Sequence, residues 1–130
     1  MTQGTAALVS ELVSANRILG HEGILDAFGH VSTRAPGGDN EAGAFLLSRA
    51  RAPELVEKAD ILAFTSEGEP VTPASRPLYI ERYIHAAIYA ARPDVGAVCH
   101  SHTPSILPFS VTTTPLRSVI HSARFIGSGA

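Results

Sequence analysis

Apolar residues recur every three or four positions near the start of the chain, at Leu8, Leu12, Ala15 and Leu19. This spacing places the four side chains on one face of a helix. Glycine is common immediately after a helix, and Gly20 follows the last of these residues. We therefore predict an amphipathic helix over residues 5–19.

Shorter apolar runs, separated by turn-forming residues, predict strands in the middle and at the end of the chain. A polar turn at 36–40 joins the first two runs and favours a hairpin, and a short helical turn is expected at 52–56. The predicted strands cover residues 28–34, 44–48, 61–65, 109–111 and 116–120.

A second amphipathic helix is predicted over residues 76–91, where Ile80, Ile84 and Ile88 recur at helical spacing. Glu81 and His85 are four residues apart and share one face of this helix. We expect His85 to pack beneath a site or to orient the glutamate. Pro93 disfavours helical geometry in the residue before it and ends the helix.

The most informative segment follows directly, where an apolar run from Val95 ends in His100-Ser101-His102. Alternate side chains of a strand point to the same side, so the two histidines can bind one metal ion. Glu81, on the preceding helix, can lie near them. Alternatively, one histidine is buried and bonded to the backbone while the other is solvated.

The order of these elements predicts an α/β fold with a largely antiparallel sheet. The chain has 130 residues, of which 45% are hydrophobic, so we expect a single domain over residues 1–130.

Charge and cysteine content exclude several classes of partner. The net charge is −2 and the ten basic residues are scattered, which argues against a nucleic-acid partner. The sequence shows no apolar run of membrane-spanning length and no leader-like start, so no membrane partner is expected. The single cysteine, Cys99, excludes an internal disulfide and fits a cytoplasmic protein. Its side chain points away from the histidines, and we interpret it as a core residue rather than a metal ligand.

Several motifs together resemble the class II aldolase/adducin family. They comprise Gly-x-Val-Ser-x-Arg at 29–34, Thr-x-x-Gly at 65–68, Glu-x-x-x-His at 81–85, Ala-Arg-Pro-Asp-Val-Gly-Ala-Val at 91–98 and His-Ser-His at 100–102. The resemblance implies a three-layer α/β/α domain with a central, mainly antiparallel mixed sheet. It also implies a homotetramer with active sites at the subunit boundaries and a small-molecule substrate.

The resemblance assigns His100 and His102 as ligands of a divalent metal ion, and Glu81 as a further ligand or the catalytic acid/base. Imidazole and carboxylate donors do not distinguish zinc, manganese, iron and cobalt. The third histidine of the family lies in a later Gly-His-Gly-like segment that this sequence lacks, so the domain is expected to miss its C-terminal part or the site to be incomplete. His121, the only later histidine, is open to three interpretations: a substitute ligand, a residue of the substrate pocket, or a histidine packed at a strand end.

Two departures from the family pattern concern the substrate. Sugar-phosphate members have Gly-Asn in the first motif and Ser-Ser before the glutamate, whereas this chain has Gly29-His30 and Tyr79-Ile80. The first motif, with Leu-Leu-Ser-Arg at 46–49 and Leu-Tyr-x-Glu-Arg at 78–82, is similar to members that decarboxylate dihydroxylated aromatic acids. We therefore expect decarboxylation, with aldol cleavage of a (phospho)sugar or hydroxy-keto acid as the alternative. The resemblance also leaves open a non-enzymatic adducin-like interaction module and a metal-dependent oxygenase.

The remaining predicted site residues bind substrate. Arg34, Arg49 and Arg76 can each clamp a carboxylate through a planar guanidinium, although for each one taken alone a surface residue or a structural ion pair is the more common role. His30 can reach the substrate or be an ordinary turn residue, and the resemblance places Ser32 beside it.

Overall fold

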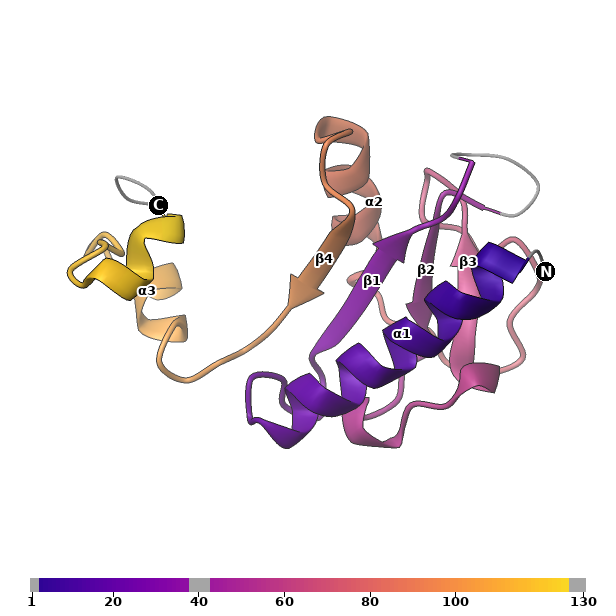
Figure 1. The fold of residues 1–130 in the computed structure, drawn as a ribbon, viewed down its shortest axis with the longest axis horizontal. Helices are drawn as coiled ribbons and strands as arrows, with labels where there is room; N and C mark the ends of the chain where they lie inside the picture. Colours follow the sequence, from indigo (N-terminus) through magenta and orange to yellow (C-terminus); the bar gives the residue numbers. More distant parts are fainter. Residues whose placement is uncertain (1–2, 38–42, 127–130) are drawn as a thin grey trace.

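A four-stranded antiparallel sheet is the centre of the computed structural model, which describes residues 3–37 and 43–126 (Figure 1). The sheet has the strand order β3-β2-β1-β4, and each neighbouring pair is antiparallel. Its strands are β1 (His30–Arg34), β2 (Phe45–Ser48), β3 (Ile61–Phe64) and β4 (Ala97–His100). The predicted α/β class and antiparallel sheet are confirmed, and no parallel pair occurs among the described strands. Residues 38–40 of the predicted turn lie outside the described ranges.

Helix α1 (Gln3–His21) covers one face of the sheet and includes the whole of the predicted first helix (Figure 1). Its Val9 and Leu12 form a buried cluster with Val31 of β1 and Leu46 of β2. The buried Asn16 accepts a hydrogen bond from the Val31 backbone N–H, which fixes the helix against the first strand.

Helix α2 (Arg82–Ala91) packs on the opposite face, so the three-layer arrangement is confirmed. Ala86 and Tyr89 join Phe45 and Leu47 in a second buried cluster. The helix begins later than the predicted residue 76 because tertiary hydrogen bonds hold the preceding segment. The Pro77 carbonyl accepts from the Ala50 backbone N–H, and the Tyr79 hydroxyl donates to the Arg51 carbonyl.

Strand β4 lies at the edge of the sheet, and its Ala97 and Cys99 are exposed. Helix α1 packs over β1 and leaves Cys99 exposed, so the prediction that Cys99 is a core residue was wrong. Two short 3-10 helices, η1 (Pro53–Leu55) and η2 (Lys58–Asp60), connect β2 to β3, and the first matches the predicted turn.

The two strands predicted near the end of the chain were wrong. Residues 107–111 form the short helix α3 (Leu107–Val111), in which Pro108 occupies a first-turn position where a missing N–H costs nothing. Residues 116–120 have no regular structure, and the final described turn is η3 (His121–Ile126). The chain leads away from the sheet after β4 and gives these segments no strand to pair with (Figure 1).

No helix within residues 3–37 and 43–126 combines the length and the apolar character needed to cross a membrane.

Candidate metal and active site

His100 and His102 converge at the end of β4. Their Nε2 atoms lie 2.9 Å apart, and the two rings meet edge to face. Two nitrogen ligands that each lie about 2.0–2.1 Å from one metal ion are about 2.9 Å apart when they meet at a right angle and about 3.3 Å apart at a tetrahedral angle. The pair therefore fits two neighbouring positions on a single divalent ion.

The carboxylate of Asp26 contacts the other ring nitrogen of His102, Nδ1. The Nδ1 atom of His102 lies 3.2 Å and 3.3 Å from the two carboxylate oxygens of Asp26. The same carboxylate accepts hydrogen bonds from the backbone N–H groups of Phe28 and Gly29. Slight burial raises the pKa of Asp26, but these hydrogen bonds more than offset it and lower the pKa overall.

The contact with Asp26 determines which nitrogen of His102 is available to a metal. A carboxylate accepts the Nδ1 proton of a neutral imidazole and leaves an unprotonated Nε2, as in the carboxylate–histidine–metal arrangements of many metalloproteins. Sequence reasoning missed Asp26. Its position before Gly29 indicates a local turn, but no sequence signal connects it with His102.

His30 lies opposite His100 in the register of β1 and β4. The two rings stack with centroids 4.9 Å apart, and the ring of Tyr79 lies 4.2 Å from that of His30. Gly29 makes this close approach possible, because a Cβ there would lie 2.8 Å from a Leu25 methyl group and 3.1 Å from the His100 carbonyl oxygen. The glycine therefore helps to bring His30 beside the predicted ligands.

A series of buried, hydrogen-bonded side chains extends from His30 to helix α2. Nε2 of His85 lies 2.9 Å from Nδ1 of His30, and Nδ1 of His85 lies 2.6 Å from Oγ of Ser32. Oγ of Ser32 is in turn 2.8 Å from the Tyr89 hydroxyl oxygen. His85 does pack beneath the site, and its ring nitrogens are bonded to His30 and Ser32.

Burial keeps both inner histidines neutral. It lowers the pKa of His30 to about 3, with the nearby His85, His100 and His102 acting in the same direction. Burial also lowers the pKa of His85 to about 4; His100 adds to this effect and the negative charge of Glu81 opposes it. Each of these two rings therefore carries one proton at neutral pH.

Glu81 is the N-cap residue of α2 and is half-buried. Its charge acts on both His85 and Tyr79. Burial is the main cause of the raised pKa of Tyr79, and Glu81 adds to it. The predicted acid/base thus lies on the same side of the sheet as the histidine cluster.

In the described part of the chain, no three His, Cys, Asp or Glu side chains form a group that could hold a metal ion. His121, for which a substitute ligand was one of three interpretations, is exposed in η3, and its hydrogen-bond partner is the neighbouring Ser122. Figure 1 shows this segment well away from the sheet. The structure therefore does not bring His121 to the histidine pair.

Arg34 is engaged with the protein backbone. Its guanidinium donates hydrogen bonds to the carbonyls of Val95, Tyr89 and Arg92, and it lies over the Tyr89 ring. These contacts join β1 to the segment between α2 and β4. They give Arg34 a structural role within this chain.

Arg49 and Arg76 meet at the buried Asp60. Arg49 Nε lies 2.6 Å from one carboxylate oxygen, Arg51 contacts the other at 2.6 Å, and the more exposed Arg76 is 3.8 Å away. Arg49 and Arg76 also line one cavity of about 290 Å³. The charge of Arg49 slightly offsets the burial that raises the pKa of Tyr79, whose ring lies beside that of His30.

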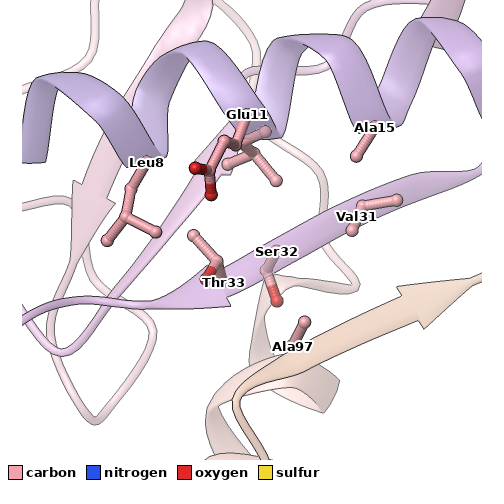
Figure 2. A pocket seen from close by; sticks show the side chains of 8 residues that line it. Leu8, Glu11, Ala15, Val31, Ser32, Thr33 and Ala97 are labelled. Carbon is pink, nitrogen blue, oxygen red and sulfur yellow. The ribbon is translucent and has the colours of Figure 1, made fainter.

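A second cavity, of about 160 Å³, lies between α1 and the sheet (Figure 2). Leu8, Glu11 and Ala15 of α1 line it together with Thr33 and Ala97. Val31, on the α1 side of β1, also lines it, and so does Ser32, whose hydroxyl is bonded to His85. Ser32 therefore lies between this cavity and the histidine cluster.

The chain matches the family described as Class II Aldolase and Adducin N-terminal domain over residues 10–128. It belongs to this family, as the motifs around His100 and His102 indicated.

Two decarboxylases are among its curated relatives. Decarboxylase tropJ of Talaromyces stipitatus is 38% identical over 122 residues, which cover 92% of this chain and 45% of that protein. The 3,4-dihydroxyphthalate decarboxylase of Arthrobacter keyseri is 30% identical over 118 residues, which cover 82% of this chain and 44% of that protein.

An aldolase is among the similar solved structures. The L-fuculose 1-phosphate aldolase from Glaciozyma antarctica PI12 superimposes with a TM-score of 0.79 at 30% identity, over 93% of this chain and 50% of that one. The chain thus spans about half the length of these relatives, and the family to which it belongs includes carbon–carbon lyases.

Proposed function

We propose that this chain carries the metal-binding half of a divalent-metal-dependent carbon–carbon lyase that decarboxylates a dihydroxylated aromatic acid. The convergence of the His100 and His102 Nε2 atoms, 2.9 Å apart, is the observation that carries this proposal. When bound, the metal ion would supply Lewis-acid stabilisation for the negative charge left on the substrate as the bond breaks.

The protein side chains divide the remaining work. His100 and His102 would hold the ion through Nε2, and Asp26 accepts the Nδ1 proton of His102 and fixes the orientation of its ring. Glu81, on the same side of the sheet, donates a proton to the substrate carbon after carbon dioxide has left. A further ligand would complete the metal site.

The surroundings of His30 support an aromatic substrate. The rings of Tyr79 and His100 flank His30, so the site is lined by rings where sugar-phosphate members of the family carry small amides and hydroxyls. The names of two relatives, a decarboxylase and a dihydroxyphthalate decarboxylase, point the same way. Arg49 and Arg76, in their shared cavity, remain our candidates to bind a substrate carboxylate.

Aldol cleavage is the second candidate function. The TM-score of 0.79 with an L-fuculose 1-phosphate aldolase favours it, because aldol cleavage needs the same stabilisation of negative charge. The two reactions differ in the leaving group, which is carbon dioxide in one and an aldehyde in the other.

The test is carbon dioxide release from 3,4-dihydroxyphthalate by protein supplied with Zn²⁺, Mn²⁺, Fe²⁺ or Co²⁺. We expect release that Glu81→Gln abolishes and that the exposed control Glu22→Gln retains. Aldehyde release from a sugar phosphate, without carbon dioxide release from the aromatic acid, would replace decarboxylation with aldol cleavage. Metal binding without either reaction would favour an adducin-like module.

We further propose that residues 1–130 form one domain, that the protein works in the cytoplasm and that it assembles as a homotetramer. The exposed thiol of Cys99 suits a reducing compartment. The proposed metal site has two histidine ligands from the described residues, which suits an assembly in which another segment supplies a further ligand.

A further inference from the structure

One nitrogen of the buried histidine network has no hydrogen-bond partner among the described residues. His30 is fully buried, and its Nε2 atom makes no hydrogen bond to any residue in 3–37 or 43–126. Its other nitrogen, Nδ1, is bonded to His85. A buried polar group without a partner calls for a specific explanation, such as contact with a ligand.

The position of each proton in this hydrogen-bonded series can be assigned by starting from Tyr89. Tyr89 is buried with its ring beneath the Arg34 guanidinium, and Ser32 Oγ is the acceptor that its hydroxyl contacts among the described residues. Tyr89 therefore donates to Ser32. The serine hydroxyl has a single proton, and Nδ1 of His85 is the acceptor that this buried proton contacts in the described part of the chain.

The protons of the two histidines can be assigned in the same way. Because Nδ1 of His85 accepts, the single proton of this neutral ring lies on Nε2 and is donated to Nδ1 of His30. His30 must then carry its own proton on Nε2, the unpaired atom. In the reverse direction Ser32 Oγ would accept from both His85 and Tyr89, and the buried serine's own proton would have no acceptor among the described residues, so the structure favours the first direction.

We infer that Tyr89, Ser32 and His85 form a proton-ordered relay that holds His30 as its Nε2–H tautomer and makes this N–H a fixed hydrogen-bond donor of the active site. The relay residues are positioning residues, since they act through His30. The bonding partner would be an anionic or carbonyl oxygen of the bound small molecule, because an N–H group at this position can only donate. The identity of this partner rests on the proposed function, whereas the tautomer does not.

The position of His30 suits this role. Its ring stacks on that of His100, one of the two predicted metal ligands, so a donor on His30 lies beside the place where substrate oxygens would bind the metal. An asparagine in the same place, as in the sugar-phosphate members of the family, also offers an N–H donor, but it needs no relay to orient its protons.

The tautomer can be read directly by NMR. In metal-free protein labelled with ¹⁵N-histidine, long-range ¹H–¹⁵N correlations distinguish protonated from unprotonated ring nitrogens, and His30→Asn identifies the His30 signals. We expect Nε2 of His30 to be protonated and Nδ1 to be unprotonated, with the same pattern in His85. A His30 protonated at Nδ1 would overturn the relay.

Substitution of the serine tests the direction of the relay. Ser32→Ala removes the donor to His85, and we expect both histidines to become mixtures of tautomers. Ser32→Thr keeps a hydroxyl and should restore the single tautomer. Ser48→Ala removes a buried hydroxyl outside the relay and should leave the tautomer unchanged. A pure Nε2–H tautomer in Ser32→Ala would contradict the relay.

The donor role is tested with Zn²⁺ and catechol as the probes. We expect the Hε2 signal of His30 to shift when catechol is added to the zinc-loaded protein. Binding of zinc and catechol without any such shift would overturn the donor role and leave the proposed function standing. If zinc does not bind, the proposed function and the donor role both fail, whereas the tautomer is judged on the metal-free spectra.

Discussion

The Nδ1 atom of His102 lies 3.2 Å from a carboxylate oxygen of Asp26, although the two residues are 76 positions apart in the chain. The same carboxylate binds the backbone N–H groups at the start of the turn that leads to His30. Asp26 therefore links the loop before β1 to the histidine pair at the end of β4. This contact leads to the first prediction.

Asp26→Asn should weaken metal binding by about 10- to 100-fold. The amide keeps an oxygen for the turn, but it no longer offers a charged acceptor to the His102 N–H. Titration of the metal against a chromophoric chelator measures the affinity, and Asp94→Asn, an exposed aspartate paired with Arg92, is the control. Equal affinities in wild type and Asp26→Asn would show that the carboxylate does not support His102.

The stability of the metal-free protein should fall as the pH is lowered from 7 to 5. His30 and His85 have folded-state pKa values of about 3 and about 4, below the ordinary value of 6.5. Between these values and 6.5 the unfolded chain binds more protons, so acid favours unfolding. At pH 5 each histidine should reduce the free energy of unfolding by about 2 kcal/mol.

Urea unfolding at the two pH values measures this effect. His85→Asn should lose about half of the dependence between pH 7 and 5, whereas the exposed His121→Asn should retain it. A free energy of unfolding that is the same at both pH values would contradict the burial of two neutral histidines.

Asp60→Asn should destabilise the fold by about 3 kcal/mol, because it leaves Arg49 and Arg51 without their shared counter-charge. The carboxylate is almost fully buried and also accepts a hydrogen bond from the Glu57 N–H. Its pKa is lowered because these contacts outweigh the effect of burial. Urea unfolding tests this against Asp94→Asn, which removes an exposed pair and should cost less than about 1 kcal/mol. Equal losses in the two variants would refute the special role of Asp60.

Local patterns predicted much of the fold. The apolar stripe from Leu8 to Leu19 indicated a helix, and the apolar run before His100 indicated a strand, because both depend on spacing along the chain. Tertiary contacts explain the errors. The Ala50 backbone N–H donates to the Pro77 carbonyl, so α2 begins later than the predicted residue 76. Cys99 is exposed because it lies on the edge strand of the sheet.

Only part of the candidate site could be predicted from the sequence. His100 and His102 are close in sequence, so their pairing could be predicted. The contacts of His30 with His100, and of Asp26 with His102, depend on strand register and on a loop contact. The relay through Ser32 depends on two residues of α2, and no pattern in a single sequence reports which side chains face each other across a fold.

The most direct test of the metal site is the metal content of the purified protein, measured by elemental analysis for wild type and for the His100→Ala/His102→Ala double variant. His21→Ala/His121→Ala, in which both residues are exposed, is the matched control. We predict close to one divalent ion per chain in wild type and control, and loss of the ion in the His100/His102 variant. A wild-type protein without bound metal, or a double variant that keeps it, would contradict the account.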